Sequence, residues 1–367
     1  MAKRQVVVVG AGVIGLTVAN RLQSSNEFEV IVVAEEIPEN STCSGSMRST
    51  AWASPWAGAH WRAYATNKDK PLQKMEYDTY AAMFEIAEAE PGSGISTAPG
   101  IDLFEDHAGE KPWYAAKVRN CAEIPEEKLP KGISYGLQYT TLLINVPKYL
   151  LYLKNKFIEA DGRIHRCRLD HIHAAMEFAS ASPEELPAIL VNCTGLGSKE
   201  LGGVEDTKMY PIRGQTLVVN APDASRSITW IGKQFSYVIP RNDGTVVIGG
   251  TAERDSWDSR PDAETSFTIM KRAIELEPNI ICKGKRIKEL EELVNDAISV
   301  NVGFRPGREG GVRLETQEIR DPVSGKPSSV VHCYGHAGYG YQSSMAFAEC
   351  VFDKVKKAAA AAAAAEA

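Results

Sequence analysis

The stretch VVVVGAGVIG at residues 6–15 decides the fold. Four consecutive valines are typical of a parallel strand that is covered on both faces, because such a strand meets no solvent on either side. The Gly-x-Gly-x-x-Gly turn leads into a helical pattern at residues 16–22. This order places a pyrophosphate against backbone N–H groups at a helix N-terminus, where the helix dipole favours negative charge. The stretch therefore predicts a dinucleotide-binding βαβ unit.

A second apolar run at residues 30–33 completes this unit and leads to Glu35. An acidic side chain about 20 residues past the glycines accepts hydrogen bonds from ribose hydroxyls. We therefore expect the adenosine ribose to lie against Glu35. The alternative, in which the glycines only permit a tight turn, leaves Glu35 unexplained. Gly10, Gly12 and Gly15 are expected against the pyrophosphate, and the residues of the turn expected to bind the cofactor are Gly10, Ala11, Gly12, Val13, Ile14 and Gly15.

Composition narrows the class of protein. The 367 residues exceed what one hydrophobic core usually serves, so two domains are expected. A hydrophobic content of 44% and a charged content of 24% are typical of a soluble globular protein. The net charge of −6 argues against nucleic-acid binding and gives no reason to expect an anionic membrane surface as partner. No apolar run suits a membrane span and no signal-peptide pattern precedes the first strand.

The cysteines form no Cys-x-x-Cys pair and are odd in number, which predicts free thiols in a reducing compartment. No His, Cys or Asp spacing suggests a metal site, so we expect none. The alanine-rich tail at residues 356–367 is interpreted as an artificial or frayed helical extension without a functional role. The seven cysteines are Cys43, Cys121, Cys167, Cys193, Cys282, Cys333 and Cys350.

The pattern of strands and helices predicts an α/β protein with two sheets. Residues 188–197 read as a buried strand that returns to the parallel sheet, where ligands bind at strand ends. Residues 236–240 and 245–250 flank an Asn-Asp-Gly turn and predict an antiparallel hairpin in a second lobe. A further strand is predicted at 216–219, and the last strand, from residue 330, ends in a glycine-rich turn. Helices are predicted at 70–89, 147–157, 261–276, 285–297 and 343–355.

Seven motifs, in order, resemble the FAD-dependent D-amino acid oxidase family, which includes the D-aspartate oxidases. The resemblance covers nearly the whole chain, and the segment at 53–58 looks like that of the fungal members. Cys333 and Ala346 depart from the family pattern, but neither adds a large side chain. The motifs lie at residues 10–15, 53–58, 192–195, 211–215, 237–240, 303–306 and 332–340.

The resemblance implies a Rossmann-like FAD-binding domain with a parallel sheet. This domain is interleaved with a substrate and oligomerisation domain built on a mainly antiparallel sheet. The FAD-binding domain is assigned residues 1–60, 140–200 and 300–355, the substrate domain 61–139 and 201–299, and the tail 356–367. A homodimer and a peroxisomal location are also implied, although the C-terminal targeting tripeptide of the family is absent and a cytoplasmic location is the alternative.

The implied activity is oxidation of D-amino acids with broad, neutral side chains. A hydride passes from Cα to FAD, the imino acid hydrolyses to a 2-oxo acid and ammonia, and O2 becomes hydrogen peroxide. Because the cofactor carries the electron chemistry, the sequence needs no acid–base dyad. Arg305 is implied to hold the substrate carboxylate bidentately, as a guanidinium fork does. Tyr237 is implied as a second carboxylate contact, the Gly338 carbonyl as the ammonium acceptor, and Gln342 as the residue that orients a water.

Other residues are implied by the resemblance to contact the flavin. Arg48, Ser49 and Thr50 are assigned to the phosphates and the ribityl chain, and small residues to positions along the isoalloxazine ring. The helix that follows the last glycine-rich turn places a positive dipole end where the reduced flavin carries negative charge. The remaining candidates are Ala53, Gly58, Ala59, Thr194, Gly195, Gly335, Gly338, Tyr339, Gly340, Tyr341 and Gln342.

The substrate side chain is assigned to a pocket formed by His60, Trp230, Lys233 and Ala252. Ala252 leaves room for bulky neutral side chains. A cationic His60 together with Lys233 would instead tolerate an acidic side chain, so D-aspartate oxidation is the alternative activity. An NAD-dependent dehydrogenase or a non-catalytic nucleotide-binding protein would share the first glycine turn but would leave Arg305 unexplained.

Overall fold

A computed structural model describes residues 3–39, 49–107, 109–179, 188–233, 235–281, 289–320 and 327–366. The chain forms two compact units, each built from separate segments. The first comprises Met1–Pro55, Leu150–Pro211 and Arg305–Ala367, and the second comprises Trp56–Tyr149 and Ile212–Phe304. The boundaries of these segments differ from those of the predicted domains. The assignment of one domain to FAD and the other to the substrate stays a prediction.

The first unit is built on a six-stranded sheet in the order β14-β15-β7-β1-β2-β6. The valines of β1 are buried and pair in register with Val30–Val33 of β2. All neighbouring strands run parallel except the edge pair β14 and β15. The predicted α/β class with a parallel sheet is therefore confirmed. The strands are β1 Arg4–Val9, β2 Phe28–Ala34, β6 Arg163–Arg166, β7 Ile189–Asn192, β14 Arg313–Arg320 and β15 Pro327–Tyr334.

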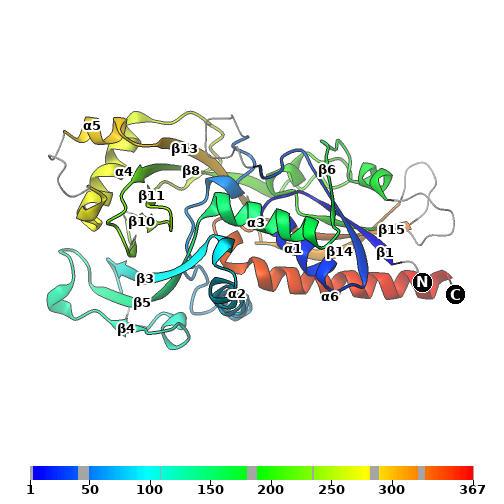
Figure 1. Ribbon diagram of the computed structural model, residues 1–367, viewed down its shortest axis with the longest axis horizontal. Coiled ribbons are helices and arrows are strands. Elements are labelled where there is room, and N and C mark those ends of the chain that lie inside the picture. The colour runs from blue at the N-terminus through cyan, green and yellow to red at the C-terminus, as the bar shows by residue number, and fades with distance from the viewer. Residues whose placement is uncertain are drawn as a thin grey trace. The chain divides into compact units, whose positions relative to one another are not determined.

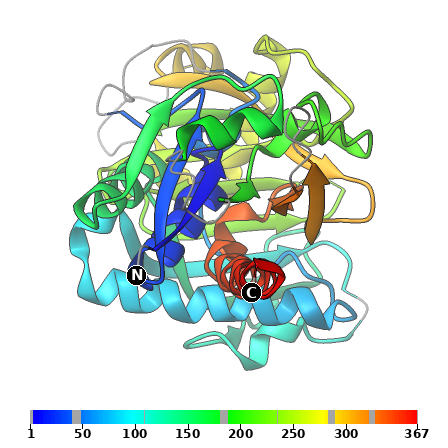
Figure 2. The ribbon, with the colours of Figure 1, turned by 90° about the vertical axis from the view of Figure 1, so that its right-hand side faces the viewer.

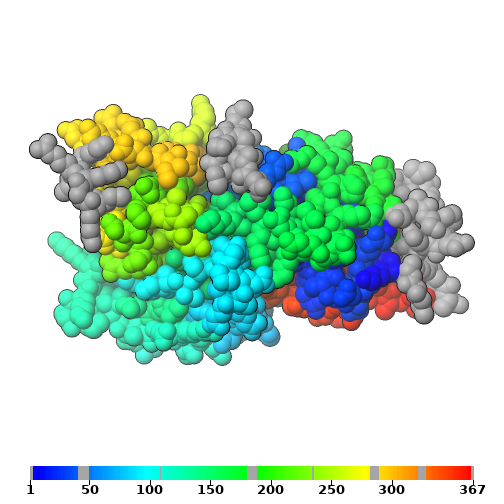
Figure 3. Space-filling model, viewed as in Figure 1, coloured from blue at the N-terminus to red at the C-terminus, as the bar shows by residue number. Residues whose placement is uncertain are grey.

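Helices α1 (Val13–Ser24) and α6 (Gly340–Glu366) lie side by side in this unit (Figure 1). Arg21 of α1 forms an ion pair with Glu349 of α6 at 2.5 Å, and its guanidinium lies 3.7 Å from the Phe352 ring centroid. Figure 2 views α6 nearly end-on beside the N-terminal segments, and in Figure 3 the side chains of the same segments border α6. Two parts of the chain far apart in sequence thus cover one face of the sheet.

The predicted end of the last helix at residue 355 is wrong, because α6 continues through the alanine run. Alanine has the highest intrinsic helix propensity, so a run of alanines extends a helix that is already nucleated. The Nη1 atom of Arg4 donates to the Ala359 carbonyl at 3.1 Å, and Ala358 is buried. The first part of the tail therefore packs on the first unit.

The second sheet has nine strands and is mainly antiparallel, as predicted. Its order is β12-β8-β11-β10-β9-β3-β5-β4, with β13 paired to β8. The predicted hairpin is formed by β10 and β11, and β3 and β9 pair in parallel. Its strands are β3 Ile95–Phe104, β4 Ala122–Glu123, β5 Tyr135–Ile144, β8 Met209–Asn220, β9 Ser227–Ile231, β10 Ser236–Pro240, β11 Thr245–Gly249, β12 Glu253–Arg254 and β13 Ser299–Arg308.

Helix α4 (Ala263–Leu276) covers this sheet, with Ile269 and Met270 packed against Val238 of β10. It begins two residues later than predicted because the Asp262 side chain accepts from the Thr265 N–H at 2.7 Å and caps the helix. The helix predicted at 285–297 is reduced to α5 (Leu290–Asn295), and its predicted first residues, 285–288, lie outside the described part of the chain. The other long helix is α3 Val146–Glu159. The short 3-10 helices are η2 Ser54–Trp56, η3 Pro91–Ser93, η4 Trp113–Ala116, η5 Glu126–Lys128, η6 Ile172–Phe178, η7 Gly195–Lys199 and η8 Pro278–Ile280.

Helix α2 (Lys70–Ala89) holds the segment that carries His60, a predicted pocket residue. The fully buried Glu76 carboxylate accepts backbone N–H groups of Tyr64 at 2.9 Å and Ala65 at 3.1 Å. Trp61 donates its indole N–H to the Glu76 carbonyl at 2.9 Å. A charged acceptor on α2 thus satisfies backbone donors of a segment without regular structure, which fixes its path.

We expect Glu76→Ala to lower the free energy of unfolding by about 2–4 kcal/mol, because it leaves two backbone N–H groups without their charged acceptor. Glu76→Gln keeps one acceptor oxygen and should lose less. Urea denaturation followed by tryptophan fluorescence measures both. Glu85→Ala, at an exposed position of the same helix, is the control. Equal stability of the Glu76→Ala and Glu85→Ala variants would contradict this role of Glu76.

Candidate active site

The predicted glycine turn is a place where backbone segments approach closely. A Cβ added at Gly15 would lie 1.9 Å from the Gly10 carbonyl oxygen, and one added at Gly10 would lie 2.6 Å from the Cys193 carbonyl oxygen. Gly10 also has φ +108°, which side chains rarely permit. The N-terminus of α1 has no acidic residue in its first turn. The turn therefore presents bare backbone and a positive dipole end to a ligand.

The strand order places this turn at a topological switch point. β1 lies between β2, which follows it directly in the chain, and β7, which comes much later. Ligands of open α/β sheets bind outside the carboxyl ends of the strands at such a point. Glu35 follows β2, Thr194 and Gly195 follow β7, and Gly335 follows β15. The predicted cofactor residues of the first unit thus lie along one edge of its sheet.

Ser54 joins the glycine turn to the start of α6, and no role was predicted for it. Its Oγ accepts the Val13 N–H at 2.9 Å, and its carbonyl accepts the Tyr341 hydroxyl at 2.9 Å. A Cβ added at Gly12 would lie 2.9 Å from Ser54 Oγ. Ser54 therefore connects the first turns of α1 and α6. Its position inside the 53–58 motif was the available signal.

Glu35 is exposed and pairs with Arg168 at 3.6 Å, a contact that water screens strongly. The neighbouring Glu36 accepts the Ser49 N–H at 3.0 Å, and Ser49 and Thr50 form the turn before Ala53. Arg48 lies outside the described residues. A hydrogen bond thus joins the segment after β2 to the segment that begins at Ser49. The cofactor contacts of Glu35, Arg48, Ser49 and Thr50 stay predictions.

The last glycine-rich turn lies against Arg305. The Ala337 N–H donates to the Pro306 carbonyl at 2.9 Å, and a Cβ added at Gly338 would lie 3.6 Å from Arg305 Cδ. Arg305 is half-buried, whereas Gln342 is buried in the first turn of α6. The Arg305 side chain therefore lies directly beside this turn, and Gly338 has no side chain that would cover the backbone carbonyls there. Tyr339 and Gly340 close this turn through a bond from the Tyr339 N–H to the His336 carbonyl.

In the second unit, Tyr237 of β10 lies opposite Gly249 of β11. A Cβ added at Gly249 would lie 2.5 Å from the phenol ring, and one at Gly250 would lie 2.8 Å from its hydroxyl. The two glycines therefore make room for the Tyr237 ring. Arg305 and Tyr237 belong to different units, so their joint contact with one carboxylate stays a prediction.

His60 is held in the second unit by a hydrogen bond between its Nδ1 and Ser227 Oγ at 2.6 Å. Burial and the neighbouring Arg62 lower the pKa of His60 to about 3. The imidazole is therefore neutral near pH 7, and the interpretation of His60 as a cation is wrong.

The preceding Gly58 and Ala59 are held by hydrogen bonds from Arg241 to the Gly58 carbonyl and by backbone pairing of Ala59 with residue 144.

A carboxylate lies among the other predicted pocket residues. Glu105 accepts the Trp230 indole N–H at 2.6 Å and the Lys233 backbone N–H at 2.8 Å. Lys233 and Ala252 are exposed. The structure thus brings Trp230 and the Lys233 backbone together through Glu105, which sequence analysis missed because it lies far away along the chain.

No group of three or more His, Cys, Asp or Glu side chains among the described residues is arranged to hold a metal ion. Within the same residues, none of the helices has the length and apolar character to cross a bilayer.

These features define a dinucleotide-binding α/β fold with a separate antiparallel sheet, and comparison with known proteins agrees. Residues 5–354 match the family model described as FAD dependent oxidoreductase. The chain belongs to this family, and its cofactor is FAD. The backbone cradle formed by Gly10, Gly15 and Cys193 fits such a dinucleotide.

The chain is similar to named enzymes along almost its full length. It is 36% identical to a D-amino-acid oxidase from Schizosaccharomyces pombe, with 94% of each chain covered. It is 30% identical to a D-aspartate oxidase from Talaromyces thermophilus, with 96% of this chain and 95% of that protein covered. The structure of glycine oxidase from Bacillus cereus superimposes with a TM-score of 0.68 at 16% identity, covering 97% of this chain and 95% of that one. This last likeness shows the shared fold.

We expect Gly15→Ala to impair FAD retention, because the new methyl group would collide with the Gly10 carbonyl. Overpacking of this kind costs about 1–3 kcal/mol, which corresponds to roughly 5- to 150-fold weaker FAD binding. Flavin absorbance per polypeptide after gel filtration measures the effect. Gly92→Ala, where a Cβ would meet nothing within 4 Å, should retain FAD normally. Full retention in the Gly15→Ala variant would contradict the predicted cradle.

Buried His332 supports the segment that carries Thr194. Its Nδ1 lies 3.3 Å from Asn192 Nδ2, and Asn192 Oδ1 accepts the Thr194 N–H at 3.1 Å. Burial and the charge of Arg313 lower the pKa of His332 to about 4. This pKa lies below the value of 6.5 in the unfolded chain, so between pH 6.5 and pH 4 the unfolded chain binds a proton that folded His332 does not. The folded protein therefore has its full stability above pH 6.5 and loses stability as the pH falls towards 4.

We therefore expect a loss of about 3 kcal/mol in the free energy of unfolding across this pH range from His332 alone. His332→Gln should show a shallower acid dependence than the unmodified protein in urea denaturation at a series of pH values. His165→Gln, at an exposed position, should leave the dependence unchanged. An identical slope for the His332→Gln variant would contradict this assignment.

Proposed function

We propose that this protein is a D-amino acid oxidase that converts a neutral D-amino acid, O2 and water into a 2-oxo acid, ammonia and hydrogen peroxide. The observation that carries the proposal is the placement of the Arg305 side chain against Gly338. The names of the full-length relatives from Schizosaccharomyces pombe and Fusarium vanettenii, the latter 34% identical, agree with it.

Arg305 and Gly338 supply complementary groups for an α-amino acid. The guanidinium fork binds the carboxylate with two parallel hydrogen bonds, and the Gly338 carbonyl accepts a hydrogen bond from the α-ammonium group. Fixing both substituents of Cα leaves one orientation of the α-hydrogen for each enantiomer, which provides selection for the D form. The Tyr237 phenol adds a donor to the carboxylate, and Gln342 orients the water near the amine.

The cofactor is assigned to the edge of the first sheet. The turn from Gly10 to Gly15 would hold the pyrophosphate, Glu35 the adenosine ribose, and Thr194 and Gly195 the adjoining part of the dinucleotide. FAD, when bound, supplies the acceptor for two electrons. The remaining work of the protein is to bind, orient and exclude water. The helix dipole of α6, which begins at Gly340, favours negative charge at its N-terminus.

Two observations support a neutral substrate side chain. His60 is neutral near pH 7, so it offers no cation to a second carboxylate. Glu105, bonded to Trp230 and to the backbone of Lys233, places a negative charge among the predicted pocket residues. An acidic side chain near this carboxylate would be repelled.

One observation favours a second candidate, oxidation of acidic D-amino acids. The Arg62 guanidinium lies 5.8 Å from the Phe235 ring centroid, and Phe235 packs edge-on against Tyr237 at 5.7 Å. Arg62 therefore carries a positive charge into the neighbourhood of a predicted substrate contact. The relative from Talaromyces thermophilus is named D-aspartate oxidase.

We expect kcat/KM for D-alanine and D-phenylalanine to exceed that for D-aspartate, with no turnover of L-alanine, in a peroxide assay. Arg305→Ala should lower kcat/KM by about 10²–10⁴-fold, because the substrate carboxylate loses a buried, charge-assisted pair. Arg305→Lys should recover only part of this loss, since an ammonium cannot bind bidentately. Near-normal turnover by a flavin-loaded Arg305→Ala variant would overturn the assignment.

Arg62→Leu separates the two substrate classes. If neutral substrates are preferred, this variant should keep kcat/KM for D-alanine within about threefold, because that substrate has no second charge. A D-aspartate preference that collapses in the Arg62→Leu variant and survives in Arg62→Lys would favour the acidic class instead. The same peroxide assay provides both measurements.

A homodimer and a peroxisomal location, both implied by the family resemblance, remain proposals. Light scattering of the purified holoprotein tests the first. Fluorescence microscopy of the tagged chain tests the second. Formation of hydrogen peroxide gives a peroxisomal location a chemical purpose, because the product is confined there.

A further inference from the structure

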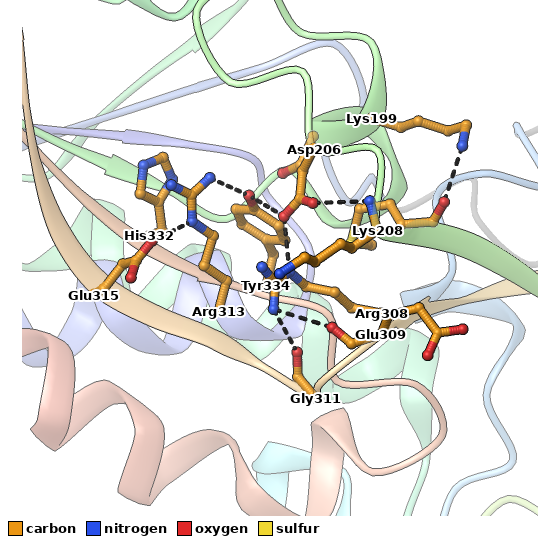
Figure 4. A network of polar contacts seen from close by, with 12 residues as sticks. Lys199, Asp206, Lys208, Arg308, Glu309, Gly311, Arg313, Glu315, His332 and Tyr334 are labelled. Atoms are coloured by element: carbon orange, nitrogen blue, oxygen red, sulfur yellow. Dashed lines mark hydrogen bonds and ion pairs between the residues drawn. The ribbon is translucent and has the colours of Figure 1, made fainter.

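Asp206 lies where several segments of the first unit meet, as Figure 4 shows. Its side chain is only 6% exposed. Oδ2 accepts from Arg308 Nε at 2.7 Å and from the Tyr334 hydroxyl at 2.9 Å, while Oδ1 accepts the Lys208 N–H at 3.0 Å. The Asp206 N–H donates to the Ser198 carbonyl at 2.9 Å. One carboxylate thus joins the end of β13, the end of β15 and the segment after η7.

The direction of the Tyr334 hydrogen bond is fixed by its second partner. Arg313 Nη1 lies 2.9 Å from the Tyr334 oxygen, and a guanidinium only donates. The phenol therefore accepts from Arg313 and must use its single proton for Asp206. Arg313 itself is held by Glu315 at 2.6 Å on its outer side (Figure 4). Asp206 thus lies between the Arg308 guanidinium and the neutral Tyr334 hydroxyl, and Arg313 lies between that hydroxyl and Glu315.

The same contacts lie next to the predicted substrate residues. Arg308 follows Arg305 by three residues in β13, and Tyr334 is followed at once by the turn that carries Gly338. A Cβ added at Gly335, which has φ +91°, would lie 2.9 Å from Arg308 Cβ. The Ala337 N–H also donates to the Pro306 carbonyl. The turn therefore contacts the segment 305–308 both at Gly335 and at Ala337.

The carboxylate is ionised under working conditions. Burial raises the pKa of Asp206, but hydrogen bonds from Arg308, Tyr334 and the Lys208 backbone outweigh this effect and lower it. Removing the charge would leave the Arg308 guanidinium, itself only 13% exposed, without its counter-ion. Arg308 would then be driven towards solvent, and it lies on the strand that carries Arg305.

We propose that Asp206 is a positioning residue, which acts through Arg308 and Tyr334 to fix Arg305 beside the turn that carries Gly338. This inference rests on the proposed function, because Arg305 and Gly338 are the groups assigned to the substrate. Asp206 touches neither of them. It sets the distance between two binding groups, one on strand β13 and the other in the turn that follows β15.

The test uses the flavin-loaded Asp206→Asn variant, which keeps the shape of the side chain and removes its charge. We expect KM for D-alanine to rise by about 10- to 100-fold, with a smaller change in kcat, because the two binding groups are displaced. Amide hydrogen exchange of residues 335–340 should accelerate by about tenfold. Tyr334→Phe should shift both quantities in the same direction.

Glu318→Gln is the matched control, since Glu318 of β14 is 66% exposed and its ion pair with Arg320, at 3.7 Å, lies outside the contacts of Asp206. Its KM and exchange rates should match those of the unmodified protein. A purely structural role would lower the unfolding temperature of the Asp206→Asn variant and leave its KM and the exchange at 335–340 unchanged, which would overturn the inference. If Asp206→Asn does not fold, Tyr334→Phe decides by the same two measurements.

The exchange measurement also separates this inference from the proposed function. If the unmodified protein oxidises no D-amino acid, the proposed function fails. Faster exchange confined to residues 335–340 in Asp206→Asn would still support the inference that Asp206 holds this turn in place. Unchanged exchange there would overturn it.

Discussion

The close approach of backbone at Gly10, Gly15 and Cys193 is the constraint on which the rest of the structure depends. Only hydrogen atoms on the two glycines let the ends of β1 and β7 and the first turn of α1 come together. The glycines provide no side chains to pack at the carboxyl edge of the sheet. Their absence leaves backbone N–H groups and the helix N-terminus accessible to a dinucleotide phosphate. The strand order then places the other predicted cofactor segments along the same edge.

Buried charge is the second organising feature, and it holds segments that carry predicted substrate residues. Glu76 fixes the segment before α2 by accepting its backbone N–H groups, and Asp206 joins the ends of β13 and β15. In both cases the carboxylate is fully partnered, as burial of a charge requires. Each held segment carries a predicted substrate residue, His60 in one unit and Arg305 in the other. The position of each of these residues thus depends on a buried charge that holds the segment carrying it.

Sequence patterns predicted the parallel sheet, the glycine turn and the hairpin because local periodicity determines them. They predicted the end of α6 wrongly, since the alanine run was treated as an appendage although it continues the helix. Ser54, Glu105 and Asp206 were missed for a different reason. Each contacts residues between 41 and 287 positions away in the chain, and no spacing rule reports such a contact. The neutral state of His60 likewise follows from burial and from Arg62, which only the folded structure reveals.

The central claim is that D-amino acids, and not their L enantiomers, reduce the bound flavin. The most direct measurement is the visible flavin absorbance of the purified holoprotein, mixed without oxygen with D-alanine and separately with L-alanine. The account predicts rapid bleaching with the D enantiomer and a stable spectrum with the L enantiomer. Bleaching by L-alanine alone, or by none of a set of neutral and acidic D-amino acids, would contradict it.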